Sequence, residues 1–127
     1  MARDAPNFLR EVVVLARANR LVSGEEFRLT SRRGRRVQTS HLAVTSLVTG
    51  STMPARFGFT MTKKIGNAVV RNRLRRQLRA IAWQLVREGT TGVDVVVRGL
   101  PGSAKADWDS LHSEFAGAIR QEREVAR

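Results

Sequence analysis

A single apolar stripe within a strongly basic segment constrains this sequence more than any other feature. Apolar residues recur there every three or four positions: Val70, Leu74, Leu78, Ile81 and Leu85. This spacing places their side chains on one face of an α-helix. We expect the helix to begin near Asn67, a favourable N-cap residue, and to end before Gly89. Because only one narrow face is apolar, the helix must pack by that face against the rest of the fold.

Cations cover most of the remaining surface of this expected helix. Residues 63–79 contain seven Lys and Arg side chains. Arg71, Arg75 and Arg79 wind from one border of the stripe toward solvent, and the outward face carries Arg76. A helix with one buried face and guanidinium groups around the rest is suited to gripping a phosphate backbone.

The charge of the whole chain supports this interpretation. Its 23 Lys and Arg outnumber its 11 Asp and Glu, and the formal net charge is +12 at pH 7. Such an excess predicts a polyanionic partner. Arg is much more frequent than Lys, and its planar fork suits bidentate contacts with phosphate. RNA or DNA is therefore favoured over a membrane surface.

Capping signals and periodicity predict two further helices. Ser23, followed three residues later by Glu26, matches a capping box and predicts a helix over residues 24–33 that ends at Gly34. A last helix is expected over residues 104–122, where apolar residues again form one stripe: Trp108, Leu111, Phe115 and Ile119.

Three segments are expected as strands. Residues 41–48 are rich in Val, Leu and Thr, residues 56–62 alternate strictly, and residues 93–98 contain three consecutive Val. The turn-forming residues 49–54 predict that the first two strands pair as an antiparallel hairpin. Gly58 lies opposite the apolar row of its strand, where a missing side chain marks a bulge or the close approach of another backbone.

The element order α-β-β-α-β-α indicates one α+β domain in which helices pack against a small sheet. We expect this domain to span residues 16–122, with a loosely ordered N-terminal extension at residues 1–15 and a short tail at residues 123–127. The chain has no Cys, and its longest apolar run, residues 12–16, is far too short to span a bilayer. With no signal peptide visible, a cytoplasmic protein is expected.

Residues that could perform catalysis are not grouped in the sequence. Asp107 and Asp109 are the closest pair of acids, but on a helix they point about 200° apart, and they are more typical of a first helical turn. His41 and His112 are isolated from other ligand-type residues. We therefore predict no catalytic residue and no metal site in this chain, which disfavours a stand-alone metal nuclease.

Residues 57–76 read FGFTMTKKIGNAVVRNRLRR and closely resemble the signature of the bacterial ribonuclease P protein, whose hallmark is an Arg-Asn-Arg helix. Further matches lie at Asn19-Arg20-Leu21, Glu26-Phe27 and Pro101-Gly102. The resemblance covers about residues 16 to 121, in the order and spacing of the family. It is far more specific than a lone Arg-Asn-Arg motif.

This resemblance implies a division of labour between protein and RNA. A large RNA subunit is the catalyst and uses Mg²⁺ to remove the 5′ leader of precursor tRNA, and the small basic protein assists. The partners implied are the catalytic RNA and precursor tRNA, with the protein monomeric when RNA is absent. The fold implied is like domain 2 of ribosomal protein S5, with about four strands in a mixed sheet and a left-handed βαβ crossover.

The resemblance also implies two RNA-binding surfaces. The surface around the Arg-Asn-Arg helix contacts the catalytic RNA through Lys63, Lys64, Asn67, Arg71, Asn72, Arg73, Arg75 and Arg76. A cleft between the sheet and the first helix takes the single-stranded leader, and the matching positions are Phe27, Ala43, Thr45, Phe57 and Phe59. Many members carry a second aromatic residue one turn after Phe27, where this chain has Ser31. Leader binding is therefore expected to depend more on charge and less on stacking.

Two alternatives stay open from the residues alone. A structural rRNA-binding protein of ribosomal type would share the charge, size and α+β fold, although it should lack the run at residues 63–73. Phe57 and Phe59 also fit an apolar core, and at least one of them is expected there.

Overall fold

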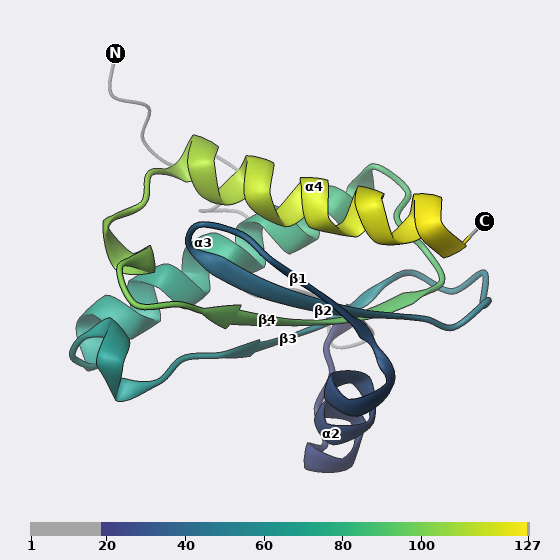
Figure 1. Ribbon diagram of the computed structural model, residues 1–127, viewed down its shortest axis with the longest axis horizontal. Helices are drawn as coiled ribbons and strands as arrows, with labels where there is room; N and C mark the ends of the chain where they lie inside the picture. Colours follow the sequence, from purple (N-terminus) through teal and green to yellow (C-terminus); the bar gives the residue numbers. More distant parts are fainter. Residues whose placement is uncertain (1–18, 127) are drawn as a thin grey trace.

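The computed structural model of this chain describes residues 19–126, with side chains described as far as residue 121. The expected N-terminal extension, residues 1–15, lies outside the described residues. The elements follow in the order α2 (Gly24–Arg33), β1 (Arg35–Gln38), β2 (Leu42–Val48), β3 (Arg56–Thr60), η2 (Lys63–Ile65), α3 (Ala68–Arg87), β4 (Val93–Gly99), η3 (Ser103–Lys105) and α4 (Trp108–Ala126). Within this range, three α-helices and a four-stranded mixed sheet form the expected α+β architecture (Figure 1).

The strands lie in the order β1-β2-β4-β3. β2 pairs antiparallel with both β1 and β4, whereas β3 is parallel to β4. The hairpin expected between residues 41–48 and 56–62 is therefore wrong, because β4 lies between those two strands. The first five residues of β4 are all buried, and burial on both faces is the environment of a central strand.

β1 is a strand that the sequence patterns did not predict. It pairs with β2 from Arg35 opposite Ser46 to Gln38 opposite Ala43, which brings the sheet to the four strands implied by the family. β3 and β4 are neighbouring parallel strands joined through α3. This is the βαβ crossover that the resemblance implies. The left-handedness of the crossover stays an expectation.

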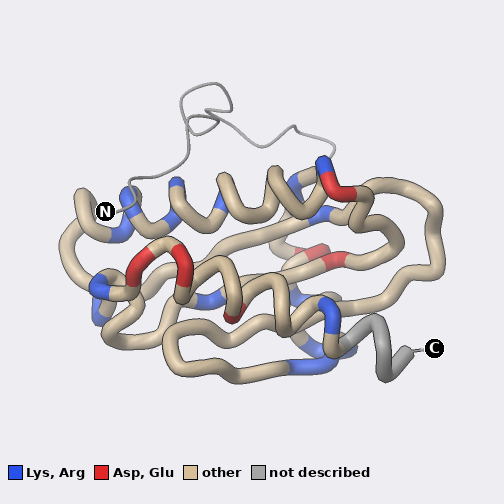
Figure 2. The backbone as a smooth tube through the Cα atoms, turned by 90° about the horizontal axis from the view of Figure 1, so that it is seen from above, with Lys and Arg blue, Asp and Glu red and all other residues tan. Residues whose placement is uncertain are grey.

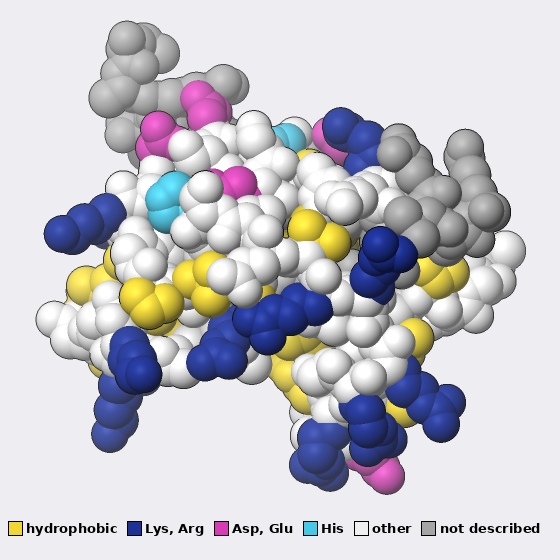
Figure 3. Space-filling view, viewed as in Figure 1, with side chains coloured by type: hydrophobic (Ala, Val, Ile, Leu, Met, Phe, Trp, Pro, Cys, Tyr) yellow, Lys and Arg dark blue, Asp and Glu magenta, His cyan; other side chains and the backbone are white. Residues whose placement is uncertain are grey.

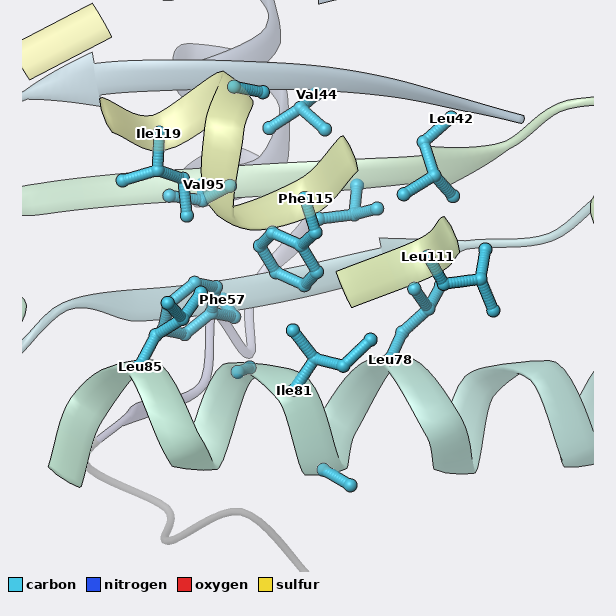
Figure 4. Close-up of a cluster of buried hydrophobic side chains, with 14 of the residues drawn as sticks. Leu42, Val44, Phe57, Leu78, Ile81, Leu85, Val95, Leu111, Phe115 and Ile119 are labelled. Carbon is cyan, nitrogen blue, oxygen red and sulfur yellow. The ribbon is translucent and has the colours of Figure 1, made fainter. Parts of the chain in front are cut away.

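The helices lie on opposite faces of the sheet. α3 and α4 cover one face and α2 lies against the other (Figure 1). The apolar core fills the space between the sheet and the two long helices (Figure 4). Phe57 from β3 and Phe115 from α4 meet edge to face there, with ring centroids 5.7 Å apart. Such a geometry adds to the burial of both rings.

The helix ends follow the capping signals with two corrections. The Ser23 side chain accepts a hydrogen bond from the Glu26 amide at 3.0 Å, and that of Asn67 accepts from the Val70 amide at 3.0 Å, so both expected N-caps are confirmed. The last helix begins at Trp108 rather than residue 104, because the short turn η3 precedes it. It also continues to Ala126, so residues 123–126 belong to the helix and not to a tail.

Gly34 ends α2 as expected, but the left-handed conformation typical of such glycines is absent, since its φ is −75°. Glycine is needed for space instead. A Cβ at this position would lie 2.5 Å from the Thr30 carbonyl oxygen and 2.8 Å from Thr45 Cγ2.

None of the described helices is both long enough and apolar enough to cross a membrane.

Candidate nucleic-acid interface

The structure divides α3 into a buried apolar face and a cationic face. Leu74, Leu78 and Ile81 have 1%, 0% and 0% of their surface exposed. The residues predicted to contact the catalytic RNA all have exposed or half-buried side chains on α3 or just before it: Lys63, Lys64, Asn67, Arg71, Asn72, Arg73, Arg75 and Arg76. Lys and Arg recur along the length of α3 (Figure 2). Burial of the stripe thus leaves the predicted residues free to face a partner.

Local hydrogen bonds orient two of these guanidinium groups. Arg75 Nη1 donates to Asn72 Oδ1 at 2.8 Å, and Arg73 Nη2 donates to the Ala104 carbonyl oxygen at 3.3 Å. Both acceptors are neutral. Within the described residues, the α3 arginines form no ion pair with a carboxylate. Their positive charge is therefore held in place without being neutralised.

Two arginines that were not among the predicted contact residues extend this surface. Arg20 and Arg79 line, together with Arg75, a hollow of about 100 Å³ beside β3. The chain around Arg20 is fixed there because the Leu21 amide donates to the Phe57 carbonyl oxygen at 2.9 Å. Burial lowers the pKa of Arg79, and the positive charges of Arg75 and Arg20 lower it further. The helical spacing of Arg79 from Arg75 was a signal for this cluster, whereas nothing local pointed to Arg20.

α2 lies against the sheet face opposite the core (Figure 1), and we call this face the cleft floor. Side chains alternate between the two faces of a strand, and Val44, Phe57 and Val95 belong to the core. The intervening residues therefore face α2: Ala43 and Thr45 from β2, Gly58 and Thr60 from β3, and Val96 and Arg98 from β4. The exposed Arg98 lies between Ala43 and Thr60 in the sheet register. Ala43 and Thr45 thus lie on the cleft floor, and Arg98 adds a cation that the predicted set lacked.

Phe27 of α2 lies directly over Gly58. A Cβ at position 58 would come within 2.3 Å of Phe27 Cζ, a distance that no side chain could tolerate. Neither a bulge nor another backbone explains Gly58, because the group that approaches it is an aromatic ring. Phe27 is half-buried, so part of its surface remains available in the cleft.

Phe57 and Phe59 line the same hollow as Phe27 and Gly58, although their rings also pack toward the core. Phe57 is 1% exposed and packs against Phe115 in the core. Phe59 is half-buried on the same side, with its ring 6.5 Å from that of Phe115. Strand alternation directs both rings toward the core, so at least one Phe lies there as expected, and the part of Phe57 and Phe59 in leader binding stays a prediction.

Arg56 connects α2 to two strands of the sheet. Its Nε and Nη2 donate to Asp94 Oδ1 and Oδ2 at 3.0 and 2.8 Å, and its Nη1 donates to Glu26 Oε2 at 2.5 Å. The Asp94 contact is bidentate, the strongest form of such a pair. The hydrogen bond from the Ser23 amide and the contact with Arg56 hold the pKa of Glu26 below its usual range. We call Glu26, Arg56 and Asp94 the Arg56 clamp.

Comparison of the sequence with known protein families agrees with the geometry of these surfaces. A family model described as Ribonuclease P matches residues 15–122. The chain belongs to the ribonuclease P protein family.

Curated relatives support the same family. The ribonuclease P protein component of Clavibacter michiganensis subsp. michiganensis is 43% identical over 106 residues, which cover 84% of this chain and 94% of that protein. The corresponding protein of Pseudarthrobacter chlorophenolicus is 39% identical, with 84% of this chain and 78% of that protein covered. As a ribonuclease P protein, this chain is the accessory subunit of the ribonuclease that processes the 5′ ends of tRNA.

Solved ribonuclease P proteins have the same fold. The protein from Thermotoga maritima superimposes with a TM-score of 0.70 at 23% identity and covers 80% of this chain and 96% of its own. The protein from Staphylococcus aureus gives a TM-score of 0.70 at 19% identity and covers 87% and 97%. At these identities the likeness concerns the fold alone.

Both histidines of this ribonuclease P protein contact neighbouring side chains within the fold. His41 Nδ1 lies 2.6 Å from Glu114 Oε2, and Thr39 Oγ1 and the His41 amide donate to Glu114 Oε1 at 2.6 and 2.8 Å. These contacts join the turn between β1 and β2 to α4. His112 lies beside the ring of Trp108. No group of three His, Cys, Asp or Glu residues within the described part of the chain could hold a metal ion.

Proposed function

We propose that this chain binds the catalytic RNA of ribonuclease P through α3 and the 5′ leader of precursor tRNA through the cleft beneath α2. The observation that carries the proposal is the division of α3. Its apolar stripe is buried in the core while the arginines of the family motif remain outside it. A helix of this kind has a complete structural role on one side and an unneutralised cationic surface on the other.

Recognition by α3 rests on phosphate contacts. Arg71, Arg73 and Arg76 project from the first half of α3, and each guanidinium group can bind a phosphate through two parallel hydrogen bonds. Such contacts fix the position of an RNA but carry little sequence information. They suit a protein that must recognise the folded shape of one large RNA.

The cleft has the features of a single-strand site. Phe27 offers a half-buried aromatic ring, and Arg98 brings positive charge to the floor. Stacking of a base on an aromatic side chain contributes about 1 to 3 kcal/mol. With Ser31 exposed one turn after Phe27, one stacking platform and the nearby arginines together bind the leader.

Mg²⁺ belongs in this proposal to the RNA-containing holoenzyme. Mg²⁺ prefers carboxylate, phosphate and water oxygens, and the α3 surface carries guanidinium, ammonium and amide groups. These residues fit phosphate rather than the metal. The chain acts in the bacterial cytoplasm as a monomer until it joins its RNA.

The test is cleavage of a leader-bearing precursor tRNA at low Mg²⁺ concentration. Three reactions are compared: this protein alone, the cognate catalytic RNA alone, and both together. We expect efficient cleavage only in the combination, because protein contacts reduce the need for Mg²⁺ to screen phosphate repulsion. Cleavage by the protein alone would reveal an active site in the chain, and an unstimulated RNA would favour a ribosomal-type RNA-binding protein.

A further inference from the structure

α2 packs against the sheet outside the apolar core. Thr30 is its one buried residue, and Leu29 is 40% exposed. No residue of α2 belongs to the apolar core formed by the described residues. The helix stands below the sheet, apart from the two long helices (Figures 1 and 3). Its position on the sheet therefore depends on contacts other than those of the apolar core.

The Arg56 clamp is the polar part of that attachment. Arg56 uses Nε and Nη2 for Asp94 on β4 and Nη1 for Glu26 on α2. Glu26 Oε1 in turn accepts from the Val22 and Ser23 amides, each at 3.3 Å. Both carboxylate oxygens of Glu26 are thus engaged, one with the start of its own helix and one with the sheet.

The apolar part of the attachment lies next to the clamp on both elements. Phe27 follows Glu26 on α2, and Gly58 is two residues after Arg56 on β3, which places Arg56 and Gly58 on the same face. The Phe27 ring occupies the space of the missing Gly58 side chain. Any rotation of α2 that releases Glu26 from Arg56 also moves the Phe27 ring across the cleft floor.

We propose that the Arg56 clamp is a positioning device for the leader cleft, in which Arg56 holds Glu26 and thereby fixes the Phe27 ring for stacking on a leader base. This inference rests on the proposed function of the cleft. Arg56, Glu26 and Asp94 are positioning residues, because their charged groups bind one another and leave RNA contact to Phe27. The Arg56 and Glu26 side chains are 38% and 30% exposed, so water screens the pair partly and its effect on leader affinity is modest.

Glu26→Gln is the most selective variant. It keeps the side chain length and the capping-box acceptor, since Gln also serves at this position. It leaves the Arg56 and Asp94 pair within the sheet intact and removes only the charged tie to α2. Glu25→Gln is the matched control, because Glu25 is an exposed acid in the same first turn and its replacement changes the net charge equally.

The measurement is the affinity of the reconstituted holoenzyme for two precursor tRNAs, one with a long leader and one with a single-nucleotide leader. We expect Glu26→Gln to lower the ratio of the two affinities by about two- to fivefold, the range that a partly exposed ion pair supplies. Binding of the protein to the catalytic RNA should be unchanged. Glu25→Gln should leave the ratio at the wild-type value.

A double-mutant cycle with Phe27→Ala separates positioning from direct contact. If Glu26 acts through Phe27, the double variant should be no weaker in leader-dependent affinity than Phe27→Ala alone. Additive losses, or an unchanged ratio in Glu26→Gln, would overturn the inference while the cleft itself stands. An unchanged ratio in Phe27→Ala would overturn the leader cleft and this inference with it. Equal loss for both substrates together with weaker RNA assembly would show a purely structural role.

Discussion

At the scale of single residues, the contact between Phe27 and Gly58 decides the shape of the cleft. The ring lies where any other side chain at position 58 would begin, so the two residues are complementary in volume. Gly58 adopts no positive φ, and its role is therefore space rather than backbone freedom. A single added methyl group tests that conclusion.

Gly58→Ala should displace the Phe27 ring and lower leader-dependent affinity while the fold is retained. Overpacking of this kind costs about 1 to 3 kcal/mol of stability, which thermal unfolding will measure beside substrate affinity. Gly117→Ala is the control, because a Cβ at position 117 of α4 meets nothing within 4 Å. Alanine there should stabilise the helix by about 0.5 to 1 kcal/mol. A Gly58→Ala protein with normal leader affinity would contradict the assigned role of Phe27.

At the scale of elements, the residues of α3 that are expected to bind RNA are distinct from those that stabilise the fold. Replacing Arg71, Arg73 and Arg75 together with Gln should strongly weaken assembly with the catalytic RNA and leave the unfolding temperature nearly unchanged. Leu78→Ala is the opposite control, since this fully buried side chain should cost about 2 to 5 kcal/mol. Circular dichroism melts and RNA-binding titrations compare the two. A large loss of stability in the triple variant would mean that these arginines hold the fold.

The link between the β1–β2 turn and α4 predicts a pH dependence. Burial alone would raise the pKa of Glu114, but hydrogen bonds from Thr39 and from His41 outweigh it and hold the pKa below its usual 4.5. A depressed folded-state pKa means that the carboxylate stabilises the fold above its unfolded-state pKa. That contribution is lost as pH falls through the folded-state value.

Glu114→Gln should therefore destabilise the protein at neutral pH by about 1 to 3 kcal/mol, the range of hydrogen bonds to a charged group. The difference from the wild type should shrink as pH falls below about 4.5. Thermal unfolding across this pH range measures it. The pKa of Asp107 is also lowered, mainly by hydrogen bonds from Ser110, so Asp107 contributes to the pH dependence of stability as well. A difference that is constant with pH would show that charge at Glu114 is unimportant.

The helices were predictable because their signals are local. Each of these signals, the caps at Ser23 and Asn67 and the apolar stripe of α3, depends on residues only a few positions apart, and the structure confirms them. β1 was missed because its sequence, RRVQ, has one apolar residue and no alternation. The pairing of β3 with β4 depends on residues that lie beyond the 20-residue helix α3. The alternation in β3 predicts that Phe57 belongs to an apolar row on one face of the strand. It does not indicate which face of the sheet packs against the core.

At the scale of the whole molecule, charge is distributed unevenly. Asp, Glu and His side chains gather near α4, while Lys and Arg crowd around α2 (Figure 3). Several acids are already engaged within the fold: Glu26 and Asp94 hold Arg56, and Glu114 holds the β1–β2 turn. The cations of α3 and of the cleft floor are not paired with these acids, and they contribute to the +12 charge that remains available to meet phosphate.

This distribution predicts how assembly with the catalytic RNA depends on salt. Each neutralised phosphate releases condensed counterions, so log K falls linearly with log[salt] with a slope of about −0.7 to −0.9 per contact. Conservative replacement of Arg71, Arg73 and Arg75 by Lys keeps the charge and should preserve that slope, although loss of bidentate geometry weakens binding at every salt concentration. Replacement of the same three by Gln should make the slope shallower by about 2 to 3. Arg120→Gln, an exposed change on α4, should alter neither slope nor affinity. Equal slopes for the Lys and Gln variants, measured by equilibrium RNA binding over a severalfold range of salt, would place the phosphate contacts elsewhere on the molecule.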